Sequence, residues 1–232
     1  MRRHNASLFG RVRTAAIIAV TAASLLLTAC SARLEKSDDD QNAATPNRPA
    51  TQLAAWAHIH SSPYQIGETA LQAYAYAAAA MDRSVQGCGI GWPTLAAIGG
   101  VESEHGTATG GKVNADATVT PKLRSLKNSD PARPRIADTD GGRYDGTSSE
   151  DRPMGPLQFL PSKWEQWSTD ADNDGTASPD DYDDAALSLA RFLCATGGDL
   201  RSPQGWSTAV AAFDPAPDFS QKVHDRAQLY SR

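Results

Sequence analysis

The sequence is poor in several residue classes, and each shortage excludes a class of protein. Only 3 cysteines are present, too few for a cysteine-rich zinc or disulfide scaffold. The 22 basic residues are outnumbered by 27 acidic ones, and four arginines lie at positions 2 to 13, before any acidic residue. The rest of the chain is therefore more acidic than the net charge of −5 indicates. Such a surface repels a phosphate backbone, so nucleic acid is not an expected partner.

Long hydrophobic runs are also absent. The longest mostly apolar stretch, residues 15–29, is shorter than the roughly 20 residues that a bilayer-spanning helix needs. It follows the arginine-rich start, an arrangement typical of a targeting segment that is removed on export. We therefore predict a signal peptide over residues 1–29.

The signal peptide ends at a cysteine. Residues 27–30 read LTAC and resemble the lipobox of bacterial lipoproteins, in which the cysteine thiol receives a diacylglycerol group and becomes the new N-terminus. This resemblance implies lipidation at Cys30 and a lipid-anchored, extracytoplasmic protein of the cell envelope. Each buried acyl methylene contributes about 0.8 kcal/mol to such an anchor. The alternative is an ordinary secretory signal with a cysteine beside it.

Lipidation of Cys30 would leave one cysteine pair, Cys88 and Cys194. Export permits a disulfide between these two residues. Two buried free thiols are the alternative. In either case two cysteines do not make a tetrahedral metal site.

Composition divides the rest of the chain. Residues 31–62 are rich in Asp, Asn, Ala, Thr and Pro and show no sustained period, so we predict a flexible stalk over residues 30–62. One folded domain is expected over residues 63–232, because this length suits a single core. Apolar residues at helical spacing predict helices at 68–81, 93–106, 161–167, 183–194, 203–213 and 219–230. Between the second and third of these, residues 107–151 form a long polar loop.

One carboxylate lies at a junction between helix and loop. Glu102 follows Val101 near the end of an apolar helix, directly before the polar loop. A carboxyl group partly buried at such a place has a raised pKa and can act as a general acid. Position alone, however, favours an ordinary surface glutamate.

Three motifs around Glu102 favour the interpretation as a catalytic acid over that as a surface glutamate. Residues 97–106 read AIGGVESEHG, residues 136–142 read IADTDGG, and residues 155–162 read GPLQFLPS. In this order they resemble the lytic murein transglycosylases of the lysozyme-like superfamily, most closely the membrane-bound family B type of actinobacterial lipoproteins. The resemblance covers residues 63–232. It implies a mostly α, lysozyme-like α+β fold, a single helical domain whose long polar loop lines the substrate cleft.

The resemblance also implies a reaction. Glu102 would be the sole catalytic residue of a glycan-cleaving lyase that acts on peptidoglycan strands, with no organic cofactor. It would protonate the β-1,4 bond between N-acetylmuramic acid (MurNAc) and N-acetylglucosamine (GlcNAc), then remove the C6 hydroxyl proton and so close a 1,6-anhydro ring. A second carboxylate is not required, unlike in most glycosidases. A hydrolytic muramidase using the same acid is an alternative, and we expect a monomer in either case.

The same resemblance assigns further residues to the substrate cleft. They are Ser103 and Gln158 beside the catalytic residue, Asp138 and Asp140 in the polar loop, and Phe213 and Asp214 in a late helix. A glutamine amide both donates to and accepts from sugar hydroxyl and acetamide groups.

The late helix departs from the family pattern. Where the family has Ala-Tyr-Asn, residues 212–214 read AFD. Phe213 removes a hydroxyl expected near the catalytic carboxylate, and Asp214 adds a charge that would raise the pKa of a nearby Glu102. An alternative function is therefore a catalytically impaired lipoprotein that binds peptidoglycan in a lysozyme-like cleft.

An acidic segment predicts a metal site. Residues 170–181 match the EF-hand calcium-loop template at positions 1, 3, 5 and 6, and Asp181 stands where a bidentate glutamate is usual. We expect a structural Ca²⁺ ion held by Asp170, Asp172, Asp174, the Thr176 carbonyl group and Asp181. Asp181 is one methylene shorter than glutamate, which weakens bidentate coordination. A solvated acidic turn is the alternative.

Overall fold

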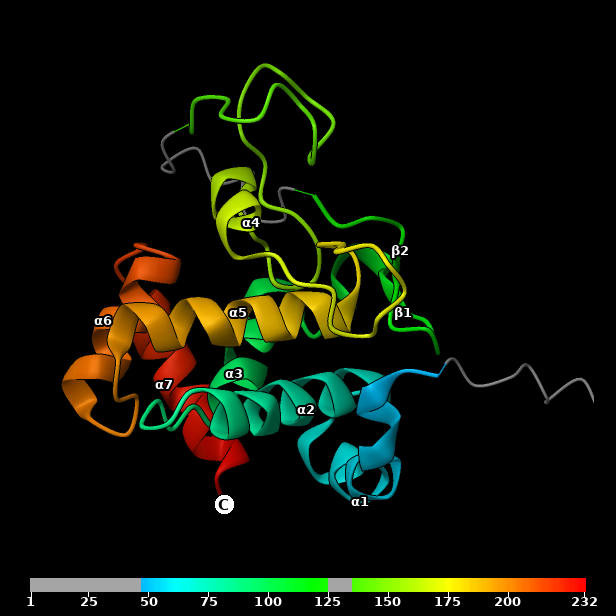
Figure 1. The fold of residues 1–232 in the computed structure, drawn as a ribbon, viewed down its shortest axis with the longest axis vertical. Coiled ribbons are helices and arrows are strands. Elements are labelled where there is room, and N and C mark those ends of the chain that lie inside the picture. The colour runs from blue at the N-terminus through cyan, green and yellow to red at the C-terminus, as the bar shows by residue number, and fades with distance from the viewer. Residues whose placement is uncertain (1–46, 125–134) are drawn as a thin grey trace, which may run out of the picture. The chain divides into compact units, whose positions relative to one another are not determined.

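The computed structural model describes residues 47–124 and 135–232 and is mostly helical (Figure 1). The predicted signal peptide, Cys30 and the first part of the predicted stalk lie outside the described residues. The elements are η1 Pro49–Leu53, α1 Ala54–Tyr64, α2 Glu68–Ser84, α3 Trp92–Ser103, η2 Ala108–Gly110, β1 Lys112–Val113, β2 Val119–Thr120, α4 Pro161–Trp167, α5 Tyr182–Gly197, α6 Pro203–Phe213 and α7 Phe219–Tyr230. Within these two described ranges, seven α-helices and one two-stranded antiparallel sheet confirm the predicted mostly α fold.

The core forms around the two longest helices. α2 and α5 lie side by side, α6 packs on α5, and α3 packs mainly against α7 (Figure 1). Leu71 and Tyr74 of α2 and Leu189 and Leu193 of α5 are fully buried, as their helical spacing requires. Each of the seven helices contributes side chains to this core or packs against it.

The start of this domain differs from the prediction. Residues 49–64 are not part of a flexible stalk, because η1 and α1 pack against α2 and bury Ala50 and Ala57. The guanidinium group of Arg48 makes a bidentate ion pair with Asp183, at 2.6 and 2.8 Å, and is 3% exposed. The prediction of a stalk reaching residue 62 is therefore wrong for this segment. Small alanine side chains and the ion pair with a residue far away in the sequence hold residues 49–64 in place. Neither feature produces a strong apolar period in the sequence.

A disulfide closes the other end of the helix pair. Cys194 in the last turns of α5 is bonded to Cys88 in the segment between α2 and α3, with a Cα–Cα distance of 5.3 Å. The predicted disulfide is present, and the alternative of two free thiols is excluded. In the chain-entropy account, a loop of about 100 residues stabilises the fold by about 4.7 kcal/mol.

The long polar loop contains little regular structure in its described part, namely η2 and the β1–β2 pair. Among the described residues, no helix is long and apolar enough to cross a membrane.

Candidate active site

Glu102 occupies the last turn of α3 and is 5% exposed. The helix begins with proline in its first turn, where a missing N–H costs nothing, and buries Leu95 and Ile98. It ends because Glu104 and His105 both adopt left-handed backbone conformations, with φ values of 52° and 58°. Glu102 is thus a buried carboxylate, and the interpretation as an ordinary surface glutamate is excluded.

Two glycines allow α3 to pack this closely. A Cβ atom on Gly99 would collide with the hydroxyl group of Tyr74, and one on Gly100 would collide with the guanidinium group of Arg226. The Gly-Gly pair of the motif therefore brings the turn that carries Glu102 against α2 and α7. The sequence motif here encodes close helix approach and not helix propensity, which glycine lowers.

Gln158 lies on a tight turn between two paired residues. Met154 and Phe159 exchange backbone hydrogen bonds of 2.8 and 2.9 Å, and this pairing reverses the chain. Gln158 has a φ of 51°, is 6% exposed, and donates from Nε2 to the carbonyl oxygen of Gly155 at 2.7 Å. A β-carbon on Gly155 would collide with the Pro179 backbone, so glycine is required at this turn.

Ser103 joins this turn to α3. Its hydroxyl group donates to the Pro156 carbonyl oxygen at 2.6 Å and accepts from the Gly106 N–H at 2.8 Å. The structure therefore brings the motifs at 97–106 and 155–162 together, as the resemblance implies. Ser103 is only 1% exposed. Its side chain connects two parts of the protein instead of presenting itself to solvent.

Phe213 and Asp214, at the end of α6, have different surroundings. Phe213 is 5% exposed and packs against Phe159 and Phe192, with ring centroids 5.2 and 5.7 Å apart. Asp214 is buried and accepts a hydrogen bond from the Ala216 N–H at 2.9 Å. Burial lowers the pKa of Lys163, and the charge of Asp214 opposes this shift, so the two side chains interact electrostatically. Phe213 thus belongs to an aromatic part of the core.

Asp138 and Asp140 lie in the polar loop and stabilise its turns. Asp138 accepts from the Gly141 N–H at 3.0 Å, and Asp140 accepts from the Tyr144 N–H at 2.7 Å. Burial raises the pKa of Asp140, but hydrogen bonds from the Tyr144 and Gly142 backbone outweigh this and lower it overall. Asp138, Asp140 and Asp151 place carboxylate oxygens within 4.8 Å of one another. The sequence did not predict this grouping, because Asp151 lies at the far end of the loop.

The predicted calcium loop has the turn geometry that its template requires. Gly175, at position 6, has a φ of 94°, which glycine adopts without steric cost. Asp170 accepts from the N–H groups of Asn173 and Gly175 at 2.7 and 2.9 Å. The loop therefore closes around the Asp170 side chain.

The carboxylates that lie close together in the predicted calcium loop include only some of the predicted ligands. Asp170, Asp172 and Asp184 form one group within 4.8 Å, and Asp172, Asp181 and Asp183 form another. Asp174 belongs to neither group. Asp183 and Asp184 are not among the ligands predicted from the sequence, because they follow the last position of the template. Their place in the first turn of α5, directly after its N-cap residue Asp181, was the available signal.

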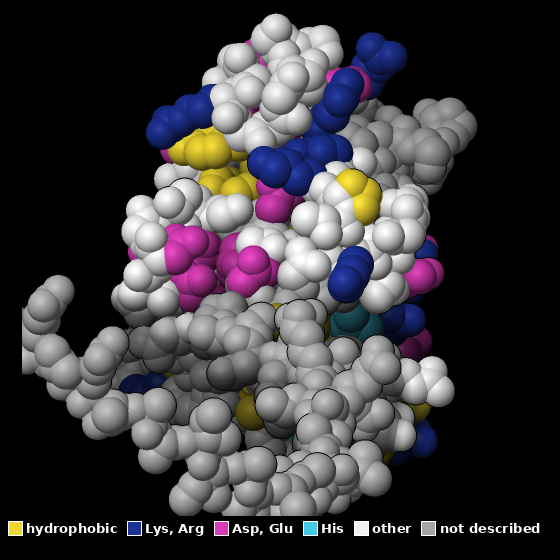
Figure 2. Space-filling view, turned by 90° about the vertical axis from the view of Figure 1, so that its right-hand side faces the viewer, with side chains coloured by type: hydrophobic (Ala, Val, Ile, Leu, Met, Phe, Trp, Pro, Cys, Tyr) yellow, Lys and Arg dark blue, Asp and Glu magenta, His cyan; other side chains and the backbone are white. Residues whose placement is uncertain are grey.

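This crowding changes the proton affinity of the buried members. Burial, with the charges of Asp184 and Asp183, raises the pKa of Asp181 to about 8. Burial, with the charges of Asp172 and Asp170, raises the pKa of Asp184 to about 7. Figure 2 shows acidic side chains gathered on the face of the molecule where this loop and the β1–β2 pair lie in Figure 1. An all-oxygen donor set of this kind could hold a hard metal cation.

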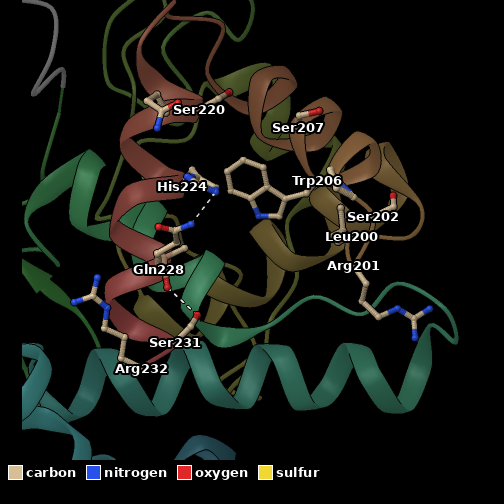
Figure 3. A pocket seen from close by; sticks show the side chains of 13 residues that line it. Leu200, Arg201, Ser202, Trp206, Ser207, Ser220, His224, Gln228, Ser231 and Arg232 are labelled. Carbon is tan, nitrogen blue, oxygen red and sulfur yellow. Dashed lines mark hydrogen bonds between the residues drawn. The ribbon is translucent and has the colours of Figure 1, made fainter.

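A separate groove lies between the start of α6 and α7. It has a volume of about 790 Å³, and Trp206 and His224, which both line it, are in edge-to-face contact with ring centroids 5.9 Å apart (Figure 3). The indole N–H of Trp206 donates to the Thr94 hydroxyl group at 3.1 Å. None of the residues that line this groove is a predicted site residue.

The helical domain carries a buried glutamate at the end of α3, and Ser103 joins this helix to the turn of Gln158, an arrangement that fits the class of glycan-cleaving enzymes that the motifs indicated. Comparison with protein families matches residues 27–230 to the Transglycosylase SLT domain. The chain therefore belongs to this family of lysozyme-like lytic transglycosylases, and its substrate is peptidoglycan. No curated protein and no solved structure matches the chain. A peptidoglycan substrate and the Cys88–Cys194 disulfide both indicate an extracytoplasmic enzyme.

Proposed function

We propose that the chain cleaves the β-1,4 bond between MurNAc and GlcNAc, with Glu102 acting first as acid and then as base. The Glu102 carboxyl proton passes to the glycosidic oxygen while the bond from that oxygen to C1 of MurNAc breaks. The acetamide group of MurNAc stabilises the cationic C1. The Glu102 carboxylate then takes the proton of the C6 hydroxyl group while the C6 oxygen forms a bond to C1. The product has a 1,6-anhydro end.

The burial of Glu102 is the observation that carries this proposal. At 5% exposure and in the last turn of α3, the carboxyl group is withdrawn from bulk water, which favours proton exchange with a bound sugar. Glu104, the nearest carboxylate in sequence, is exposed and lies beyond the helix in a left-handed conformation. A single-carboxylate mechanism suits this arrangement better than a pair of catalytic carboxylates would.

The remaining cleft residues divide into two proposed roles. Gln158, Asp138, Asp140 and Asp214 contact sugar hydroxyl or acetamide groups, because each carries a polar group able to bond them. Ser103 and Phe213 support the cleft from behind, since both are buried and contact other parts of the protein. In this proposal Phe213 replaces a hydroxyl-bearing residue of the family without entering the chemistry.

We further propose that the acidic loop binds a structural Ca²⁺ ion. Asp170, Asp172 and Asp181 are ligands from the predicted set, and Asp184 joins them because it lies within 4.8 Å of Asp170 and Asp172. Asp174 and the Thr176 carbonyl group complete the set as the template requires. Asp181 Oδ1 also accepts hydrogen bonds from two N–H groups of α5, so the ion would fix the start of this helix.

We also propose a subtype within the family and a location for the protein in the cell. The order of the motifs and the calcium loop favour the membrane-bound family B type. The LTAC segment favours a lipid anchor at Cys30, and we propose a monomer that reaches its substrate from this anchor.

Analysis of reaction products tests the proposed function. The purified protein is incubated with insoluble peptidoglycan, and the soluble products are analysed by mass. Anhydro-muropeptides from the unaltered protein, and at least a hundredfold less from Glu102→Gln, would support it. Products heavier by one water would identify a muramidase. Binding of peptidoglycan without release would identify an impaired binder, the alternative that the Phe213-Asp214 pair raises. Equal cleavage by Glu102→Gln would contradict the assignment of Glu102.

A further inference from the structure

A chain of buried hydrogen bonds runs past the turn that follows Glu102. His105 Nε2 pairs with the Tyr230 hydroxyl group at 3.0 Å, and His105 Nδ1 pairs with the Tyr74 hydroxyl group at 3.2 Å. The Tyr74 hydroxyl group in turn bonds the Tyr182 hydroxyl group at 2.8 Å. We call these four residues the histidine–tyrosine chain. It joins α7, the end of α3, α2 and α5 in a single line.

Both ends of the histidine–tyrosine chain have further partners. Tyr182 interacts electrostatically with Ser103, whose hydroxyl group donates to Pro156 in the turn that carries Gln158. At the other end, Tyr230 interacts electrostatically with Arg226, whose charge opposes the effect of burial on the pKa of Tyr230. The network therefore connects the C-terminal helix to the Gln158 turn, and it flanks Glu102 in sequence at positions 103 and 105.

His105 holds a left-handed backbone conformation, which is uncommon for residues other than glycine. Its φ of 58° lies in the left-handed region, directly after Glu104 at 52° and before Gly106 at 85°. Non-glycine residues rarely take this conformation without surrounding contacts that fix it. Here the two hydroxyl partners fix the ring, and the His105 N–H donates to the Gly99 carbonyl oxygen at 3.1 Å. This arrangement ends α3 immediately after the turn that contains Glu102.

The network is buried and stays uncharged at its centre. His105 is 7% exposed, and burial together with the charge of Arg226 lowers its pKa to about 4. Burial also raises the pKa of Tyr74 and of Tyr182 above the ordinary value. The hydroxyl and imidazole groups therefore keep one protonation state near neutral pH. Such a network fixes geometry and does not exchange protons with a substrate.

We propose that His105 is a positioning residue for Glu102. Through its two tyrosine partners it holds the last turn of α3 at a fixed distance from the Gln158 turn, so that the carboxyl group meets the glycosidic oxygen. This inference rests on the proposed function, in which Glu102 is the acid and base. A displacement of about 1 Å at a catalytic group can lower the rate a hundredfold, so loss of this network should affect turnover strongly.

Kinetics of matched variants of the full chain test the proposal. Tyr74→Phe and His105→Phe each remove hydrogen bonds while keeping a ring of similar shape, and we expect kcat to fall at least tenfold with KM changed less than twofold. Tyr76→Phe is the control, because this residue lies on the same helix and its hydroxyl group has no hydrogen bond among the described residues. His105→Asn, which restores one donor and one acceptor, should recover part of kcat. Unchanged kcat per folded molecule in both Phe variants would overturn the proposal.

Hydrogen exchange provides a readout that does not need catalysis. In His105→Phe we expect faster amide exchange in residues 99–106 and 155–158, with α6 unchanged. Equal acceleration throughout the domain would indicate a general loss of stability and would refute a positioning role, as would unchanged exchange in both segments. If the unaltered protein releases no glycan product, the proposed function fails, while the exchange result still decides whether His105 fixes this turn.

Discussion

The Ser103 hydroxyl group donates to the Pro156 carbonyl oxygen at 2.6 Å, and this bond joins the helix of Glu102 to the turn of Gln158. The two residues are 53 positions apart in the sequence, and the polar loop lies between them. The bond is buried, so no water can replace it when it is broken. This bond therefore contributes to the relative position of the two motifs.

Replacement of this serine should cost both stability and activity. Ser103→Ala leaves the Pro156 carbonyl oxygen without its donor, and a buried polar group left unsatisfied costs about 1–3 kcal/mol of unfolding free energy. For a domain of this size we expect Tm to fall by roughly 2–4 °C per kcal/mol, measured by thermal unfolding. Ser162→Ala, at an exposed position in α4, is the control and should leave Tm unchanged. An unchanged Tm for Ser103→Ala would show that the bond between Ser103 and Pro156 contributes nothing to the free energy of unfolding.

The sequence predicted the helices better than the contacts between them. The bounds of α4, α6 and α7 agree with the predicted segments, because an apolar period marks all three helices and proline in the first turn marks the start of α4 and α6. Glu102 was found through its motif, not through its helix position. Its burial depends on Gly99 and Gly100, whose role is visible only when Tyr74 and Arg226 are placed against them.

The features that the sequence did not predict share a physical cause, because each depends on a contact with a residue or element far away in the sequence. Residues 49–64 fold because Arg48 reaches Asp183, 135 positions away, and no local period announces such a contact. Asp184 joins the acidic loop because the first turn of α5 returns to it. Spacing templates describe consecutive positions and so omit a ligand supplied by the next element.

Removal of calcium should make stability depend on pH. The folded-state pKa values of Asp181 and Asp184 are raised to about 8 and about 7, above the ordinary value of 3.8. Their contribution to stability is thus fully present below about pH 4 and is lost as pH rises through 7 to 8. We expect the Tm of chelator-treated protein to fall between pH 5 and 8. Added Ca²⁺ should raise Tm more at pH 8 than at pH 5, because it binds the ionised carboxylates.

Thermal scans at several pH values, with chelator or with Ca²⁺, measure this effect. Asp184→Asn removes one charge from the group and should reduce both the pH dependence and the response to Ca²⁺. Asp116→Asn, in the exposed turn before β2, is a control outside the acidic loop. A Tm that responds to neither Ca²⁺ nor chelator at pH 8 would support the alternative of a solvated acidic turn.

Reduction of the disulfide should destabilise the domain without changing its fold. The Cys88–Cys194 bond connects the segment before α3 to the end of α5, and loss of a native disulfide typically costs 2–5 kcal/mol. We expect the double variant Cys88→Ser with Cys194→Ser to unfold at a lower temperature, with an unchanged helix content by circular dichroism at 20 °C or below. A reductant should lower the Tm of the unaltered protein but not that of the double variant, and a reductant effect on both would point to another cause.

The Arg48–Asp183 ion pair should contribute strongly to the free energy of unfolding. Both side chains are almost fully buried, at 3% and 1% exposure, so removal of one partner leaves an uncompensated charge. Breaking such a pair typically costs 3–5 kcal/mol, and here Asp183 also lies near Asp172 and Asp181, whose repulsion Arg48 offsets. Arg48→Ala should therefore lower the denaturant midpoint strongly.

A matched pair of variants separates this effect from loss of a surface charge. Arg201→Ala breaks an ion pair with Asp199 in which both side chains are exposed, and solvent screening leaves such pairs with little effect on stability. The midpoint of Arg201→Ala should stay close to that of the unaltered protein. If Arg48→Ala behaves in the same way, residues 48–64 are not held by this ion pair, and the alanine contacts of η1 and α1 with α2 alone retain them. A large difference between the two variants would instead show that folding of the N-terminal segment depends on a carboxylate at the edge of the acidic loop, because Arg48 is the only residue of that segment bonded to Asp183 within the described chain.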